Sequence, residues 1–231
     1  MRFRIKNSIK CNSCNKEIPN YLDTCPYCGA FIRSRRNNLN IWITIFNLFA
    51  EPVVTMKDII FVKRKSGMFI LFLFTILGLS LLNFIYLNFQ AQINLGVHAF
   101  LTSFWLTFKE MIFLMFSYSI LSKFLLGLIG FKARIKDLWA VSVYSFVPFI
   151  LSLFLLLPIE IGLFGEFWFT FHPYPWIIKS FPAYFLLFVH GLMLTWSLIL
   201  FYIGLKSIYM NFLIALTSWL LFIVLSFYIL I

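Results

Sequence analysis

Four cysteines near the N-terminus have the spacing of a metal site. Cys11 and Cys14 form one Cys-x-x-Cys pair, and Cys25 and Cys28 form a second after ten intervening residues. Each pair can direct two sulfurs at one ion, and two pairs supply the four ligands that structural zinc prefers. Gly29 follows the second pair, where a tight turn needs backbone freedom. The spacing therefore predicts a zinc-ribbon in which zinc has a structural role.

Two other uses of the cysteines compete with zinc. A redox-active Cys-x-x-Cys needs only one pair, within a thioredoxin-like βαβ context. Two disulfides would need an oxidising compartment. A module of about twenty-five residues cannot bury a sufficient hydrophobic core, so a metal ion accounts best for its folding.

Basic residues flank the cysteines on both sides: Arg2, Arg4, Lys6, Lys10, Arg33, Arg35 and Arg36. Such a cluster could bind nucleic acid. Beside a membrane, however, basic residues usually contact anionic lipid and fix the orientation of the chain. We therefore expect the lipid bilayer to be the partner of this cluster, and we do not expect nucleic acid.

The composition predicts a membrane protein. Of 231 residues, 62% are hydrophobic and only 12% are charged, and 31 are phenylalanine. A soluble domain carries about 25% charged residues, and the surface of a soluble fold this apolar would be one continuous hydrophobic patch. An all-α integral membrane protein with about five transmembrane helices is the fold class that fits.

Stretches of about 20 apolar residues, which are long enough to cross the hydrocarbon core, mark the predicted spans. They are Met68–Gln90, Met111–Gly130, Leu138–Pro158, Pro182–Leu205 and Tyr209–Ile231. A further apolar run, Ala99–Phe108, is re-entrant, interfacial or an extension of the second span, and the sequence does not choose among these.

The distribution of basic residues predicts the topology. With the N-terminus inside, the inner segments hold seventeen Lys and Arg residues and the outer segments hold only Lys109 and Lys179. Because cytoplasmic loops are enriched in these residues, we expect a cytoplasmic N-terminus and an external C-terminus. The cysteines would then face a reducing compartment, which favours zinc over disulfides.

The segment between the ribbon and the spans predicts helices that lie in the headgroup region. Asn40, Thr44 and Asn47 form a polar stripe on an otherwise apolar helix, and Pro52 begins a second helix. The residues predicted to contact the membrane interface are Trp42, Phe46, Phe49, Lys57, Lys63, Arg64 and Lys65. An alternative is that these helices pack on the outside of the bundle.

The sequence shows no catalytic motif, so we do not expect an enzyme. No Asp or Glu lies inside a predicted span, and His190 is alone in the fourth. Glu160, Glu166 and His172 fall in a predicted outer loop, where they could bind a cation but are better explained as solvated residues. Ion-coupled transport usually needs acidic residues at mid-membrane, which weakens that alternative.

Three stretches resemble the Yip family of five-span membrane proteins. Phe49–Ile59 is similar to its pre-membrane segment, Phe131–Pro148 to its basic loop and third span with Tyr-x-x-x-Pro, and Trp196–Leu205 to the end of its fourth span. The resemblance covers residues 49–231, and prokaryotic members often carry an N-terminal zinc-ribbon. It implies a membrane organiser or adaptor in a prokaryotic cell membrane.

These observations predict three regions: a ribbon with its basic flank (1–38), interfacial helices (39–66) and a five-helix Yip-like domain (67–231). The function we expect is a non-enzymatic membrane scaffold whose ribbon docks a cytoplasmic protein. A component of a transporter or permease is one alternative, and a membrane-tethered regulator with a nucleic-acid-binding ribbon is another. The sequence predicts no oligomeric state.

Overall fold

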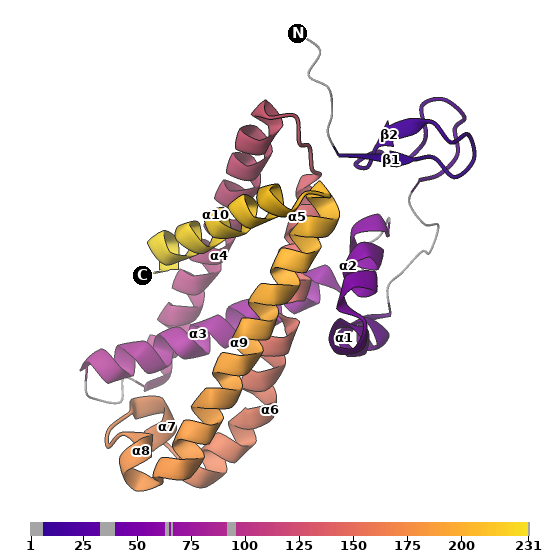
Figure 1. The fold of residues 1–231 in the computed structure, drawn as a ribbon. Coiled ribbons are helices and arrows are strands. Elements are labelled where there is room, and N and C mark those ends of the chain that lie inside the picture. Colours follow the sequence, from indigo (N-terminus) through magenta and orange to yellow (C-terminus); the bar gives the residue numbers. More distant parts are fainter. Residues whose placement is uncertain (1–6, 33–39, 63–64, 66, 92–95, 231) are drawn as a thin grey trace.

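A computed structural model of the chain describes residues 7–230 except 33–39, 63–64, 66 and 92–95. A two-stranded sheet precedes a chain of helices (Figure 1). The elements are β1 (Ser8–Lys10), β2 (Glu17–Pro19), α1 (Ile41–Ala50), α2 (Pro52–Phe61), α3 (Met68–Ala91), α4 (Gly96–Leu128), α5 (Ile135–Ser145), α6 (Val147–Phe164), α7 (Phe167–Thr170), α8 (Pro175–Ile178), α9 (Ser180–Tyr209) and α10 (Phe212–Leu230).

Four helical stretches of the described chain are long and apolar enough to cross a membrane. They are α3, most of α4, α5 with α6, and α9. This pattern supports the predicted all-α integral membrane protein. The last helix, α10, is equally apolar but shorter, so a count of five spans stays a prediction.

The second span is longer than the sequence suggested. Ala99–Phe108 belongs to α4, which continues without a break through Lys109 and Glu110. Of the three alternatives, the extension of the second span is therefore the one that the structure contains. A helix of 33 residues is about 50 Å long at 1.5 Å per residue, so it exceeds the hydrocarbon core and must tilt or project from it.

The third span is interrupted at Phe146, which separates α5 from α6. Pro148 lies at the start of α6 and has no backbone N–H, so it cannot bond to the carbonyl one turn earlier. The neighbouring α9 supplies an acceptor at the same break, because the Phe149 N–H in the first turn of α6 donates to the Ser197 Oγ at 3.1 Å. An interruption next to Pro148 agrees with the kink that a proline inside a span predicts.

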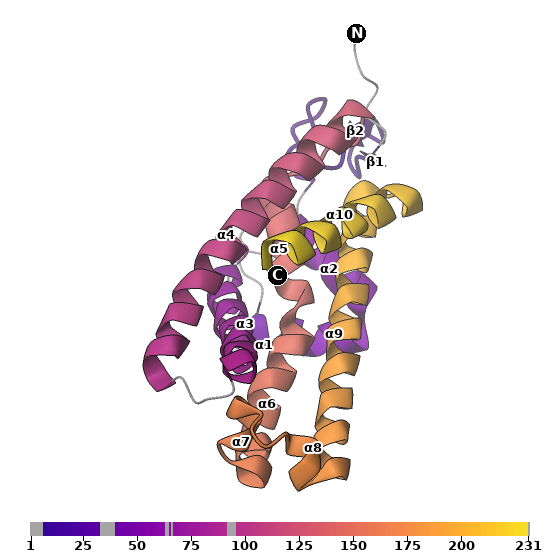
Figure 2. The same ribbon diagram turned by 90° about the vertical axis from the view of Figure 1, so that its left-hand side faces the viewer.

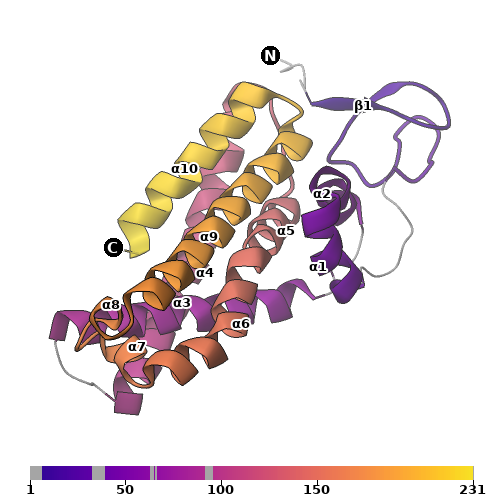
Figure 3. The same cartoon turned by 60° about the horizontal axis from the view of Figure 1, so that its bottom comes forward.

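The helices do not form a simple parallel bundle. In Figures 1 and 2, α5, α6 and α9 run alongside one another, whereas α3 crosses them. Figure 3 shows α10 folding back over α9, and α10 also contacts α4. The ribbon, residues 7–32, lies at the end where α5 begins and α9 stops, which we call the ribbon end. The short helices α7 and α8 cover the opposite, far end.

Candidate metal centre and buried ion pairs

The two Cys-x-x-Cys pairs adopt the same backbone conformation. In the first, the Asn15 N–H donates to the Cys11 carbonyl at 2.9 Å, and the Cys11 N–H donates to the Lys16 carbonyl at 3.0 Å. In the second, the Gly29 N–H donates to the Cys25 carbonyl at 2.9 Å. Asn15 and Gly29 both have left-handed φ angles, 53° and 70°. Only Gly29 was predicted to need this freedom, although asparagine also tolerates it.

The four sulfurs converge on one point. All four Sγ atoms lie within 4.8 Å of one another, with Cys11 and Cys28 3.6 Å apart and Cys14 and Cys25 3.7 Å apart. A tetrahedral site with metal–sulfur bonds of about 2.3 Å has sulfurs about 3.8 Å apart. The cysteines are free thiols. The predicted ligands therefore come together as a group that could hold one metal ion.

Charge coupling within the cluster favours a cation. Hydrogen bonds from the backbone N–H groups of Cys14 and then Ser13 lower the pKa of the Cys11 thiol to about 6. The pKa of Cys28 rises to about 12, because desolvation and the neighbouring thiols outweigh the Ala30 N–H, which lowers it. Adjacent thiols cannot all ionise together without a counter-charge. A divalent cation would supply that charge in place of the retained proton.

A buried pair of asparagines joins the ribbon to the helices. The Asn7 Nδ2 donates to the Asn20 Oδ1 at 3.0 Å and to the Lys132 carbonyl at 2.6 Å, and the Asn7 Oδ1 accepts from the Lys132 N–H at 3.2 Å. The Asn20 Nδ2 donates to the Ile208 carbonyl at 2.7 Å. Both asparagines are buried. They provide hydrogen-bond partners for the N–H and carbonyl of Lys132 in its loop and for the Ile208 carbonyl in the last turn of α9, where helix carbonyls lack partners within the helix.

A second contact at this junction is an ion pair. Arg134 Nη1 lies 2.5 Å from Asp23 Oδ1, with both side chains partly exposed. The ribbon, the basic 130–136 loop and the end of α9 therefore share one end of the molecule. In the predicted topology an even number of spans separates these three segments, which would place them on one side of the membrane.

The aromatic residues predicted to contact the membrane are exposed on α1. The exposed fractions are 80% for Trp42, 72% for Phe46 and 42% for Phe49. The three residues of the polar stripe differ in exposure: Asn40 is exposed and Asn47 half-buried, whereas Thr44 is buried against the protein together with Leu48. In a chain surrounded by lipid, this arrangement turns the aromatic face outward and the hydroxyl inward, where the Thr44 Oγ1 donates to a carbonyl in its own helix.

The second interfacial helix packs on the bundle. Met56, Ile59 and Ile60 are buried where α2 contacts α5 and α9. Lys57 is exposed. The structure thus supports the alternative that this segment packs on the outside of the bundle, while α1 keeps an aromatic face. Lys63 and Arg64 lie outside the described residues.

Lys65 was predicted to meet lipid headgroups, but its side chain lies inside the protein. Its Nζ is 3.1 Å from Asp137 Oδ1, and the two side chains are only 8% and 4% exposed. The ammonium group also donates to the Ile59 and Ile60 carbonyls, in the last turn of α2. Asp137 lies in the first turn of α5. Each charge thus meets the helix terminus of opposite polarity.

A buried histidine–carboxylate pair lies toward the far end. His190 of α9 places its Nε2 2.5 Å from Glu160 Oε1 of α6 and its Nδ1 3.0 Å from Ser152 Oγ. The Glu160 side chain is 3% exposed and the His190 side chain 14%. Glu160 was predicted to lie in an outer loop, but Pro158 does not end the helix, and Glu160 lies in α6 within a stretch long and apolar enough to cross a membrane. Asp137 lies near the other end of that stretch, and Glu110 lies within α4.

The hydrogen bonds around His190 place a proton on its Nδ1 and direct its Nε2 at a carboxylate oxygen. Ser152 Oγ donates to the Phe149 carbonyl at 2.7 Å, so it accepts from the Nδ1–H of His190. The Nε2 then faces Glu160 Oε1, and a proton shared between these two atoms leaves the pair neutral overall on either of them. Because its hydroxyl proton is committed to that carbonyl, Ser152 is not an activated nucleophile. The cluster can hold and pass a proton.

The other residues of the predicted outer loop do not join Glu160. Glu166 and His172 are exposed near α7. Within the described ranges, the four cysteines form the one group of three or more potential metal ligands. The suggested cation site in this loop is therefore not assembled there, which agrees with the interpretation as solvated residues.

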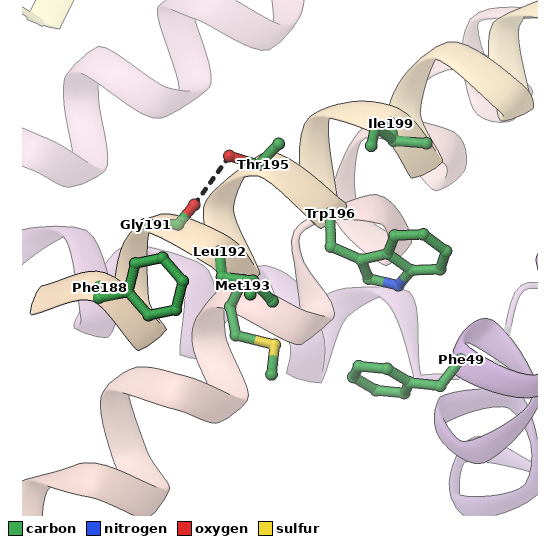
Figure 4. A pocket seen from close by; sticks show the side chains of 8 residues that line it. All are labelled: Phe49, Phe188, Gly191, Leu192, Met193, Thr195, Trp196 and Ile199. Carbon is green, nitrogen blue, oxygen red and sulfur yellow. Dashed lines mark hydrogen bonds between the residues drawn. The ribbon is translucent and has the colours of Figure 1, made fainter. Parts of the chain in front are cut away.

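An apolar groove runs between α1 and α9 (Figure 4). Its volume is 660 Å³, and Phe49, Met193 and Trp196 converge on it. The Thr195 hydroxyl donates to the Gly191 carbonyl at 2.8 Å, and the buried Trp196 Nε1 has no acceptor among the described residues. The lining suits an apolar chain and offers no group for chemistry.

No family model matches this chain, and no curated protein or solved structure was found to be similar to it.

Proposed function

We propose that this protein is a non-enzymatic membrane scaffold whose zinc-bound ribbon is held at the cytoplasmic end of a helix bundle and presents a docking surface to a cytoplasmic protein. The junction made by Asn7 and Asn20 carries the proposal. Two buried amides that bond to a loop and to a helix end hold the ribbon in a fixed position on the bundle. A rigid mount of this kind suits a ribbon that must present a surface in a defined orientation.

Zinc is the metal proposed for the ribbon. Four thiolates in a closed tetrahedral set are typical of a structural zinc site, which leaves no open position for a substrate. The spacing and the converging sulfurs both support this choice. In this proposal zinc replaces the core that so small a module lacks.

The surface available to a partner lies on the second half of the ribbon. Tyr27 and Phe31 are 61% and 57% exposed, and the Lys16 ammonium lies 4.6 Å from the centre of the Tyr27 ring. Exposed aromatic residues beside a cation are common at protein interfaces. The resemblance to the Yip family, which stays a prediction, also implies an adaptor.

The test combines metal analysis with photo-crosslinking in native membranes. The purified protein should contain about one zinc per chain, and Cys25→Ser should abolish it while the spans remain inserted. A photoreactive amino acid at Tyr27 should crosslink to a protein, and Cys25→Ser should prevent the crosslink. The matched control is the same probe at Tyr228, which is 85% exposed on α10.

Two results would contradict the proposal. A chain without zinc, or with disulfides among its cysteines, would remove the structural basis of the ribbon. Crosslinks from Tyr27 to lipid alone, or equally from Tyr228 to the same protein, would remove the docking surface.

A second candidate function is proton-dependent transport, and the Glu160–His190 pair favours it. Ionisable residues within a span are costly and commonly belong to proton or substrate pathways. The two grooves described in this structure are lined by neither residue. For this reason we rank transport below the scaffold.

Proton flux in proteoliposomes separates the two candidates. If the pair relays protons, vesicles with the wild-type protein should acidify faster than empty vesicles under an imposed pH gradient, and Glu160→Gln should abolish the difference. The control is Glu166→Gln, which removes an exposed carboxylate six residues away. Equal rates for wild type, Glu160→Gln and empty vesicles would eliminate transport of protons.

A further inference from the structure

A basic pocket lies at the ribbon end, between the end of α4 and the beginning of α5. Its volume is 470 Å³. The lining residues that matter here are Tyr21, Lys123, Gly127, Lys132, Arg134 and Lys136. Because Tyr21 comes from the ribbon and the others from the helices and their loop, the pocket is complete only when the ribbon is docked.

The positive charge of the pocket is largely uncompensated. Arg134 is paired with Asp23, and Asp137 is paired with Lys65. The remaining cations are the exposed lysines at 123, 132 and 136, and no carboxylate of the described chain forms an ion pair with any of them. Three ammonium groups around one concave surface favour an anion.

The backbone adds donors to the same surface. α5 begins at Ile135, and no side chain caps its N-terminus. The N–H groups of Ile135 and Lys136 are in the first turn and have no acceptor within the helix. Both residues line the pocket. The positive end of the helix dipole therefore reinforces the lysines.

An exposed apolar surface adjoins the pocket. Phe124 and Leu128 of α4 are 63% and 57% exposed, and Ile135 is 38% exposed. Phe124 and Leu128 flank Lys123 and Gly127 on a helix that is long and apolar enough to cross the membrane. The pocket thus lies where a charged recess meets a lipid-facing surface, which favours an anion that carries hydrocarbon chains over a free ion.

We infer that this pocket binds the phosphate headgroup of an anionic phospholipid, with its acyl chains along the exposed face of α4. The lysines at 123, 132 and 136 and the first amides of α5 contact the phosphate. Since this site needs neither a protein partner nor proton transfer, it is independent of both functions proposed above.

Native mass spectrometry of the full-length protein tests the site with two lipids of identical chains, phosphatidylglycerol and phosphatidylcholine. The wild type should retain one phosphatidylglycerol in preference to phosphatidylcholine. Lys123→Gln with Lys136→Gln should weaken that binding about thirty-fold, since each lysine near an anionic headgroup is worth about 1 kcal/mol. Lys57→Gln with Lys206→Gln removes the same charge from exposed positions outside the pocket and should leave binding unchanged.

A second variant blocks the pocket without changing its charge. A Cβ added at Gly127 would meet no atom within 4 Å, and Gly127 lines the pocket, so Gly127→Leu should fold and fill it. It should reduce phosphatidylglycerol binding at least ten-fold. Gly162→Leu is the matched control, because that helical position is equally open and lies in α6 near the far end.

Three outcomes would overturn the inference. One is equal retention of the two lipids by the wild type. Another is an equal loss in the Lys57/Lys206 control, which would mean general attraction of a basic protein to anionic lipid. The third is displacement of the lipid by millimolar inorganic phosphate, which would mean that the pocket binds the free ion.

Discussion

The third span carries a buried carboxylate near each of its ends, and the two carboxylates have different partners. Asp137, at the ribbon end, is paired with a lysine from the segment after α2. Glu160, toward the far end, is paired with a histidine from α9. The ordinary pKa of lysine, about 10.4, lies far above neutral pH, whereas that of histidine, about 6.5, lies close to it.

We therefore call the Lys65–Asp137 pair a structural joint, which holds segments together, and the Glu160–His190 pair a potential switch, which can change its protonation. Lys65 also bonds to two carbonyls of α2, so its charge holds three segments together at the ribbon end. His190 bonds to a serine and a carboxylate, and one proton can move between it and Glu160 without changing the net charge. Mutations at the two pairs should therefore lower the free energy of unfolding by different amounts.

The largest effect is expected at the joint. Asp137→Asn leaves the Lys65 ammonium buried without a counter-charge, which should lower the free energy of unfolding by about 3–5 kcal/mol. Titration of the detergent-solubilised protein with a denaturing detergent measures this free energy of unfolding. Asp58→Asn, which removes an exposed carboxylate from α2, should change stability little. Equal stability of Asp137→Asn and Asp58→Asn would show that the buried pair is not a joint.

The double change Lys65→Met with Asp137→Leu sharpens the same comparison. Replacing both charges by apolar side chains removes the unpaired ion, so the double variant should be more stable than Asp137→Asn. A double variant that is less stable than Asp137→Asn would mean that the bonds from Lys65 to the α2 carbonyls matter more than the ion pair.

An intermediate effect on stability is expected at the junction between the ribbon and the bundle, which also lies at the ribbon end. Asn20→Ala removes the shorter of two side-chain hydrogen bonds to the Ile208 carbonyl and leaves only the Asn7 Nδ2, 3.5 Å away. It also removes the Asn20 Oδ1 that accepts from Asn7, so the total cost should be about 1–3 kcal/mol. Undocking should expose the Lys132 N–H, so hydrogen exchange there should become about ten-fold faster for each 1.4 kcal/mol. Asn12→Ala, an exposed ribbon position, is the control. Unchanged exchange at Lys132 in Asn20→Ala would mean that the ribbon is held by other contacts.

The smallest effect is expected at the far pair. Glu160→Gln should cost about 1 kcal/mol, because the amide can still form a hydrogen bond with His190. The same detergent titration would measure it. A loss as large as that of Asp137→Asn would contradict the distinction between joint and switch.

Local spacing predicted the metal site, and hydropathy predicted the membrane helices. Cys11, Cys14, Cys25 and Cys28 lie close in sequence, so their convergence needs only two short turns. Helix length follows from the apolar composition, although α4 continues past Lys109 because a helix longer than the bilayer can place that residue outside the hydrocarbon core.

The pairs between distant segments could not be predicted. Glu160 and His190 are thirty residues apart, and their contact depends on how α6 packs on α9. A basic residue beside a span can face lipid or the protein, so Lys65 looked the same as its neighbours in sequence. Periodicity identified the polar stripe that includes Thr44, but not whether water or protein would face it.

The junction between ribbon and bundle has a consequence for how the protein is made. Asn20 bonds to a carbonyl 188 residues further along the chain. At about 5–20 residues per second, a ribosome reaches that carbonyl roughly 10–40 s after it passes Asn20. The ribbon can acquire its metal early, but the bond from Asn20 to Ile208 cannot form until the end of α9 has been synthesised. Docking of the ribbon is therefore a late step of biogenesis, and it marks chains whose four long helices are already in place.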